Sequence, residues 1–173
     1  MVTRATADEE TLPDINDFSI AVLQNNNVQL TWNRYADFTD GTEIAAGNYT
    51  LKATYGNIET QGFEAPYYEG AKRVLHKKRT KSTNISVICY LANVKVTTEY
   101  TELFKKYFTD YTVNIRPAGS TDISFDKNET RAAYVKPGKI SIYLSGSKQQ
   151  GNKSHNFEAA TIRECKGTPT ITV

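Results

Sequence analysis

Alternation of apolar and polar side chains is the dominant pattern along this chain. In residues 17–22, the side chains of Phe18, Ile20 and Val22 fall on one side of an extended chain. The same period of two recurs in residues 47–53, 84–87, 93–100, 110–115, 138–144 and 170–173. Because successive side chains of a strand point to opposite faces of a sheet, each segment predicts a strand with one buried face. Glycine-containing turns at 45–48 and 136–139 bound these strands and favour a sandwich or a barrel.

Three of these segments recur in the same order in the two halves of the chain. Residues 17–22 match 110–115, residues 47–53 match 138–144, and residues 84–87 match 170–173. An ordered set of matches predicts an internal repeat, with chance similarity between generic strands as the alternative. We therefore expect two tandem β-sandwich domains, 1–92 and 93–173, that meet between Leu91 and Val94. With almost no linker between them, they should form a fairly rigid rod.

One helix is expected, over residues 101–108. Thr101 can cap its first turn. The apolar side chains then pair at a spacing of four, which stabilises a helix. These pairs are Leu103 with Tyr107 and Phe104 with Phe108. The corresponding residues 12–16 of the first half predict only a turn.

Both copies of the repeat are expected to be incomplete at one end. The first copy should open with a strand equivalent to 93–100, yet only a few residues precede its acidic turn. The second copy should continue past Val173. A sheet that lacks its first strand exposes unpaired backbone groups, so we expect this edge to accept an added strand. The alternative is that a leader or the ordered N-terminal segment of the same molecule fills the position.

Composition and charge exclude several classes of protein. The chain has 173 residues, of which 39% are hydrophobic and 23% charged, and its formal net charge is +2. This charge is too small and too dispersed for the phosphate contacts of a nucleic-acid-binding protein. No segment approaches the ~20 apolar residues that span a bilayer, and Glu9 and Glu10 interrupt any signal-peptide core. Either the protein is cytoplasmic, or Met1 starts an exported chain whose signal has been removed.

Candidate catalytic and metal-binding residues are few and scattered. His76 and His155 lie in different halves, have no partner at metal-ligand spacing and are expected in exposed loops. Asp37, Asp40 and Glu43 could belong to a calcium site, but the residues between them indicate a solvated turn. The chain also contains no phosphate-binding glycine loop, nucleophile elbow or zinc motif. We therefore expect neither an enzyme nor a cofactor.

The two cysteines lie in different halves of the chain. Cys89 shares the alternating apolar side of Ile85, Val87 and Leu91. It is therefore expected to be a buried free thiol that packs as a small hydrophobe. A disulfide bond with Cys165 would have to cross between domains and is the alternative.

A basic run occupies residues 72–81. It contains seven Lys, Arg or His side chains among ten residues. Such a run can contact an anionic polysaccharide or a lipid headgroup. The alternative is a hairpin whose solvated lysines discourage pairing at the sheet edge.

The aromatic loop 63–70 is the best candidate for a binding site. Phe63, Tyr67 and Tyr68 follow a glycine and include an adjacent tyrosine pair. Exposed tyrosine rings can stack against sugars or partner proteins. The alternative is that these rings cover one end of the sandwich as part of its core.

Five strings of the sequence together carry a resemblance to known proteins. The strings are Val2-Thr3-Arg4-Ala5, Leu12-Pro13-Asp14-Ile15-Asn16-Asp17-Phe18, Ala46-Gly47-Asn48-Tyr49-Thr50-Leu51-Lys52-Ala53-Thr54-Tyr55-Gly56, Phe63-Glu64-Ala65-Pro66-Tyr67-Tyr68-Glu69-Gly70 and Leu91-Ala92-Asn93-Val94-Lys95-Val96. They resemble an uncharacterised domain family of Bacteroides surface lipoproteins, which is similar to the fimbrillin-like proteins of the Bacteroidales. The resemblance covers most of the chain up to about Leu144.

The resemblance implies an exported outer-membrane lipoprotein whose lipidated cysteine lies upstream of Met1. It also implies an all-β fold of tandem Ig-like or transthyretin-like β-sandwich domains, without catalytic activity. In fimbrillins, an arginine-directed protease removes the first strand, and the region around Arg4 is similar to that cleavage site. The leader and the C-terminal donor segment of a full fimbrillin are missing here, which leaves polymerisation open.

These observations predict a non-enzymatic structural or adhesion protein of the cell surface, in the form of a fimbrillin-like pilus subunit or a stalk. The alternative is a glycan-binding module of an outer-membrane lipoprotein, with Tyr67, Tyr68 and Phe63 as contacts. Other surface proteins or glycans are the expected partners, nucleic acid is not, and membrane association would occur only through the upstream lipid anchor.

Overall fold

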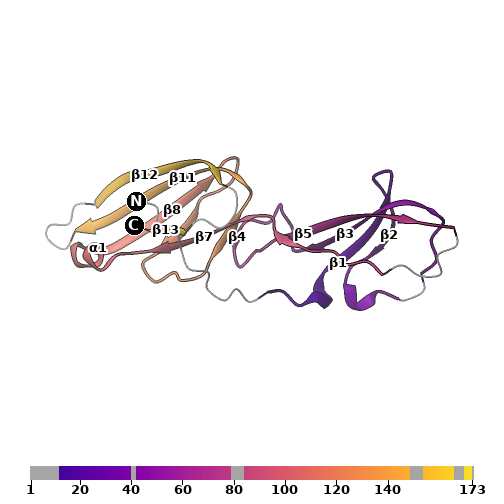
Figure 1. Cartoon of the computed structure of the whole chain (residues 1–173). Coiled ribbons are helices and arrows are strands. Elements are labelled where there is room, and N and C mark those ends of the chain that lie inside the picture. The colour runs from indigo at the N-terminus through magenta and orange to yellow at the C-terminus, as the bar shows by residue number, and fades with distance from the viewer. Residues whose placement is uncertain (1–11, 40–41, 79–83, 149–153, 166–169, 173) are drawn as a thin grey trace. The chain divides into compact units, whose positions relative to one another are not determined.

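The computed structural model describes residues 12–39, 42–78, 84–148, 154–165 and 170–172 (Figure 1). More than half of the described residues lie in strands. One short α-helix and two 3-10 turns are the helical elements among the described residues. The chain is therefore mostly β, as the alternation predicted. Its described residues fall into two compact units, with 57–66 and 93–172 in unit 1 and 12–56 and 67–92 in unit 2.

Unit 2 contains one antiparallel sheet of five strands. Their order across the sheet is β2-β1-β3-β5-β6. The strands are β1 (Ser19–Gln24), β2 (Asn27–Trp32), β3 (Gly47–Tyr55), β5 (Tyr68–His76) and β6 (Tyr90–Leu91), and the 3-10 turns are η1 (Ile15–Asp17) and η2 (Tyr35–Asp37).

A tight hairpin joins β1 to β2. Its two loop residues, Asn25 and Asn26, have φ angles of 51° and 64°. Two-residue hairpin loops favour this left-handed backbone because its twist matches that of the strands, and asparagine adopts it more readily than most residues. The asparagine run therefore determines where the chain reverses.

One face of this sheet carries the core of unit 2. Val22, Tyr49 and Ala53 are buried on it, as the period of two predicted. The Tyr49 hydroxyl donates a hydrogen bond to the Ala45 carbonyl oxygen at 2.9 Å. At the end of the face, the rings of Phe18 and Tyr55 lie 5.5 Å apart.

Residues 84–89 approach the sheet without joining it as a strand. Cys89 is a free cysteine there, but it is half-buried instead of buried, with its Sγ 3.8 Å from the Ala53 carbonyl oxygen. Partial burial raises the pKa of its thiol. A Cβ atom on Gly70 would clash with the Ile88 carbonyl oxygen. The absence of a side chain at Gly70 therefore allows residues 84–89 to pack closely on β5. Backbone pairing with β5 begins only at Tyr90.

Unit 1 contains two four-stranded sheets. Their orders are β13-β7-β10-β4 and β12-β11-β8-β9, and β13 lies parallel to β7 whereas the other neighbours are antiparallel. The strands are β4 (Gly62–Phe63), β7 (Val94–Glu99), β8 (Phe108–Pro117), β9 (Ile123–Asp126), β10 (Ala133–Val135), β11 (Gly138–Lys148), β12 (Ser154–Cys165) and β13 (Thr170–Thr172).

The two sheets of unit 1 share one hydrophobic core. Its buried members come from β7 and β10 in the first sheet, from β8, β9 and β11 in the second, and from Tyr100 just after β7. Phe125 is the largest fully buried side chain among the described residues. Removing this much apolar surface from water is the main stabilising contribution to the unit. The buried members are Val94, Val96, Tyr100, Tyr111, Val113, Ile115, Phe125, Ala133, Val135, Ile140 and Ile142.

Two of the segments matched in the sequence pair with the same register in both units. In unit 2, β1 pairs with β3 so that Ile20 faces Ala53 and Val22 faces Leu51. In unit 1, β8 pairs with β11 so that Val113 faces Leu144 and Ile115 faces Ile142. These four pairs are the ones that the sequence matches equate. The third match differs, since 170–172 form β13 but 84–87 form no strand.

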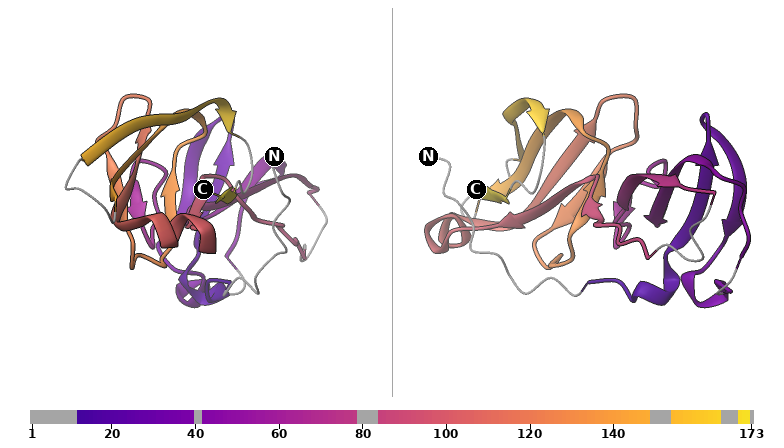
Figure 2. Two further views of the ribbon diagram at one scale, coloured as in Figure 1. Left: turned by 90° about the vertical axis from the view of Figure 1, so that its left-hand side faces the viewer. Right: turned by 45° about the vertical axis from the view of Figure 1, so that its right-hand side comes forward.

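The predicted helix is present as α1 (Glu102–Tyr107), at the end of unit 1 where β8 begins (Figure 2). The Thr101 hydroxyl oxygen accepts a hydrogen bond from the Phe104 backbone N–H at 3.3 Å, which caps the first turn. The rings of Phe104 and Phe108 are 4.5 Å apart and face the core. Leu103 and Tyr107, by contrast, remain exposed.

Residues 57–66, here called the β4 segment, belong to unit 1 although 12–56 and 67–92 on either side belong to unit 2. Strand β4 pairs with β10, where Phe63 faces Ala133 and Gly62 faces Tyr134. The expected division into 1–92 and 93–173 placed this segment in the first domain. The structure instead places it at the edge of a sheet whose other strands come from the second half of the chain.

Candidate binding surfaces

The two tyrosines that the sequence singled out, Tyr67 and Tyr68, lie in the core of unit 2. They are 8% and 6% exposed. The Tyr67 hydroxyl donates a hydrogen bond to Glu69 Oε2 at 3.0 Å, and the Tyr68 ring lies 6.4 Å from the rings of Phe18 and Tyr55. Burial, followed by the hydrogen bond to Glu69, raises the pKa of Tyr67 to about 12. This position favours the packing role that the sequence left open.

Phe63, the third residue of the expected site, belongs to unit 1. Its half-buried ring lies 5.1 Å from the Phe125 ring, close to edge-to-face. The guanidinium carbon of Arg131 lies 4.7 Å from the centre of the Phe63 ring. The residues of the expected site are therefore divided between the two units.

Arg131 is held over the Phe63 ring by charge pairing. Its Nε and Nη2 atoms donate hydrogen bonds to the two carboxylate oxygens of Glu129 at 3.0 and 2.8 Å. Its Nη1 atom lies 3.5 Å from a carboxylate oxygen of Glu64. The bonds from Arg131 lower the pKa of Glu129 to about 2, and Glu129 raises the pKa of Arg131 in turn. Such a two-point pair fixes the plane of the guanidinium.

Further polar contacts fasten the rest of the β4 segment to unit 1. Asn93, which is 2% exposed, donates a hydrogen bond from Nδ2 to the Ala65 carbonyl oxygen at 2.9 Å. The Lys136 backbone N–H donates to Gln61 Oε1 at 3.0 Å, and the Lys136 ammonium pairs with the Glu59 carboxylate. These contacts hold the β4 segment against the rest of unit 1.

A second aromatic cluster lies in unit 2 and was missed by the sequence analysis. Trp32, Tyr35 and Phe38 occur at intervals of three residues, and η2 occupies the turn between the last two. A 3-10 turn has three residues per turn, so side chains at i and i+3 lie one above the other. The spacing of three was the signal that could have revealed it. We call these three residues the aromatic face.

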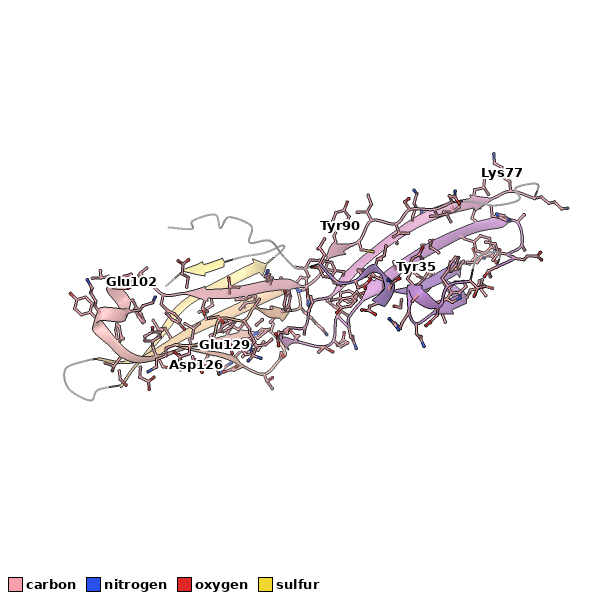
Figure 3. The ribbon with its side chains drawn as sticks, turned by 90° about the horizontal axis from the view of Figure 1, so that it is seen from below. Tyr35, Lys77, Tyr90, Glu102, Asp126 and Glu129 are labelled. Carbon is pink, nitrogen blue, oxygen red and sulfur yellow. The ribbon has the colours of Figure 1, made fainter. Side chains whose placement is uncertain are left out.

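The aromatic face is partly open to solvent. Tyr35 and Phe38 are 43% and 38% exposed. Their rings are nearly parallel, with 15° between the planes and 6.1 Å between the centres. The Trp32 ring packs against Phe38 in an edge-to-face contact, with 5.0 Å between the ring centres. Figure 3 labels Tyr35 on η2.

Charged side chains adjoin the aromatic face. Arg34, which precedes η2, donates a hydrogen bond from Nη2 to Asp17 Oδ1 at 2.9 Å, and both side chains are about half exposed. This bond joins η2 to η1, where the Asp14 carboxylate caps the first turn. Asp37 is exposed on η2 itself. The region therefore combines flat apolar rings with groups that can donate and accept hydrogen bonds.

The remaining expected sites are placed as follows. Lys72, Arg73, Lys77 and Lys78 are exposed on or just after β5, as Figure 3 shows for Lys77. The rest of the basic run, 79–81, lies outside the described residues, as do Arg4 and Asp40. His76 ends β5 and is half-buried, so it does not lie in the expected exposed loop.

The part of the chain that the structure describes has no group of three or more His, Cys, Asp or Glu side chains placed to hold a metal ion. No helix within it is long and apolar enough to cross a membrane. The side chains of His155 and Cys165 lie outside the described part.

Comparison with known proteins finds a matching family and several similar solved structures. One of these structures is described as a "putative cell adhesion protein" from Bacteroides thetaiotaomicron, is 14% identical and has a TM-score of 0.50. The similarity covers 93% of this chain and 80% of that one, and at this identity it shows likeness of fold alone. No curated protein matches the chain. A family model described as "Domain of unknown function (DUF4493)" matches residues 1–173, so the chain belongs to the DUF4493 family.

Proposed function

We propose that this chain is a non-enzymatic protein of the bacterial cell surface with a structural or adhesive role. The observation that carries the proposal is the similarity in fold, along 93% of the chain, to a structure described as a putative cell adhesion protein. The contacts of the aromatic loop 63–70 also support this proposal, because these contacts pack the core and hold the fold together. The proposed partners are other surface proteins or glycans, and nucleic acid is not among them.

The proposed architecture is a tandem of two related β-sandwiches of the Ig-like or transthyretin-like kind. The register shared by the β1–β3 and β8–β11 pairs supports a common origin of the two units. The two facing sheets of unit 1 support the sandwich form for that unit. An experimental structure tests this directly: two units that do not superpose along these strand pairs would overturn it.

The finer proposal is a fimbrillin-like pilus subunit or a stalk, anchored in the outer membrane through a lipid. It rests on the resemblance of the quoted strings, including the Thr3-Arg4-Ala5 region, to Bacteroides surface lipoproteins. Electron microscopy of intact cells with antibody against the chain tests for filaments. Labelling confined to short surface projections would favour the stalk, and labelling only after lysis would overturn a surface location.

The role itself is tested in the bacterium that carries the gene. A strain lacking the gene should adhere less to surfaces that the parent strain colonises, and the wild-type gene should restore adhesion. A complementing gene with Tyr107→Ala is a control, since this exposed tyrosine lies on α1 of unit 1 and is not part of the aromatic face of unit 2. Unchanged adhesion and unchanged surface structures in the deletion strain would overturn the proposal.

Glycan binding is the second candidate function. The expected contacts Tyr67 and Tyr68 are buried, so they do not support it. The exposed rings of Tyr35 and Phe38 favour it instead, because exposed aromatic groups of this kind often mark a binding surface.

A further inference from the structure

We propose that the aromatic face of unit 2, formed by Trp32, Tyr35 and Phe38, is a binding site for a neutral glycan. The inference deepens the adhesive role proposed above and rests on it. Its starting point is that two nearly parallel rings remain partly open while a third ring holds one of them in place. A surface built in this way binds flat apolar groups without first having to order its own side chains.

The apolar part of the site fits the C–H face of a pyranose ring. One face of many sugar rings carries several axial hydrogens and few hydroxyls, and this face packs against an aromatic ring. The ring centres of Tyr35 and Phe38 are 6.1 Å apart, which allows a glycan chain to contact both rings. The Tyr35 residue is the more exposed of the two, so it should carry the larger share of the contact.

The polar neighbours fit the hydroxyl groups of the same ligand. Arg34 and Asp17 bond to each other through one nitrogen and one oxygen, at 2.9 Å. A guanidinium has five N–H donors and a carboxylate has two oxygens, so both groups keep capacity for further bonds. Sugar hydroxyls donate and accept, and can therefore replace the water around this pair.

The same ion pair argues against an apolar protein segment as the ligand. Covering half-exposed charges with apolar side chains would remove their water and offer no hydrogen bonds in return, which is costly. The balance of charge also selects among glycans. Arg34 bonds to Asp17, and the exposed Asp14 and Asp37 belong to the same two turns, η1 and η2, so the summed charge of these four side chains is negative and a sulfated or uronic acid chain would be repelled. A neutral glycan is the ligand class that meets both conditions.

The test uses the full chain on an array of neutral plant, microbial and mucin oligosaccharides, with heparin fragments as the anionic comparison. Glycans that bind are then titrated calorimetrically against four proteins: wild type, Tyr35→Ala, Arg34→Gln and Tyr90→Ala. Tyr90 is a matched control because it is an even more exposed tyrosine of the same unit, at 68%. Circular dichroism confirms that each variant is folded.

The expected result is binding to neutral glycans that weakens about tenfold or more in Tyr35→Ala, as is usual for truncated aromatic anchors. Tyr35→Phe, which keeps the ring, should retain most of the affinity, and Tyr90→Ala should bind as wild type does. The proposal is overturned if no neutral glycan binds, if only heparin fragments bind, or if Tyr35→Ala and Tyr90→Ala bind equally well.

Failure of this site is distinguishable from failure of the adhesive role. If the purified chain binds no neutral glycan while the deletion strain loses adhesion, the site is wrong and adhesion uses another surface. If the chain binds glycans through Tyr35 while the deletion strain adheres normally, the site stands and the adhesive role fails.

Discussion

The guanidinium of Arg131 lies 4.7 Å from the centre of the Phe63 ring, and the two residues come from the two described stretches of chain in unit 1. Phe63 also packs against Phe125 in the core, so one ring contacts a charged group on one side and an apolar group on another. Glu129 and Glu64 hold the guanidinium in position. The pair therefore links the β4 segment to both the core and the surface of unit 1.

Replacing Phe63 by alanine should destabilise unit 1. The change removes the contact with Phe125 and the ring beneath Arg131, and we expect the free energy of unfolding to fall by about 2–4 kcal/mol, somewhat less than for a fully buried phenylalanine. Urea denaturation measures the loss, and faster hydrogen exchange at the Glu64 amide would locate it at β4. Tyr107→Ala is the control, with an expected change of roughly 0.5 kcal/mol or less. If Phe63→Ala and Tyr107→Ala lower the free energy of unfolding by the same amount, the contacts of Phe63 contribute no stability.

The Glu129 pair should make unit 1 sensitive to acid. The pKa of this carboxyl is lowered from 4.5 to about 2 by the bonds from Arg131. The ionised carboxylate therefore stabilises the folded protein at pH values above 4.5, the pKa of the unfolded chain. This stabilisation is lost as the pH falls from about 4.5 to about 2. Melting temperatures measured across this range should therefore fall less steeply for Glu129→Gln than for wild type. Parallel pH profiles for the two proteins would contradict the assignment.

Tyr67 should have the opposite dependence, at alkaline pH. Its pKa is raised from 10.0 to about 12 by burial and by Glu69. The folded protein therefore favours the neutral phenol more than the unfolded chain does. This preference stabilises the fold below pH 10.0, and the stabilisation is lost as the pH rises toward about 12. Ultraviolet titration of phenolate should show a late-titrating tyrosine that is absent in Tyr67→Phe. A wild-type curve in which every tyrosine titrates near its ordinary value would refute this.

Gly70→Ala should disturb the packing of residues 84–89 on β5. The added Cβ would clash with the Ile88 carbonyl oxygen and approach Cys89 Sγ to 3.0 Å. We expect a loss of about 1–3 kcal/mol, the usual range for overpacking. Faster reaction of the Cys89 thiol with a maleimide would report that the segment has moved away. Ala71→Ser, at the neighbouring exposed position, is the control. If the Cys89 thiol reacts no faster in Gly70→Ala than in Ala71→Ser, the packing of residues 84–89 does not depend on glycine at position 70.

Local pattern was sufficient to predict much of the fold. The alternation around Ile20 and Val113 predicted β1 and β8, and Thr101 predicted the start of α1, because these signals act between residues that are near in sequence. Strand β4 could not be predicted in this way. It has only two residues and therefore no period, and its partner Ala133 is distant along the chain.

The candidate site was less predictable than the fold, for a related reason. Composition identifies Tyr67 and Tyr68 as aromatic, but whether they are buried depends on what covers the sheet. Tyr35 and Phe38 carried a usable signal in their spacing of three, yet a 3-10 turn must be assumed before that spacing has meaning. Exposure is a property of the assembled unit, and a single sequence records it only indirectly.

The position of β4 also constrains how the protein is made. A ribosome releases the N-terminal part of the chain first, so residues 57–66 emerge well before Ala133–Val135, the strand with which they pair. During that interval, the N–H and C=O groups of this segment have no partner strand, so they must bind water or a chaperone. Synthesis that stopped after residue 92 would leave β4 permanently without its partner. The first half of this protein therefore cannot finish folding until most of the second half has been translated.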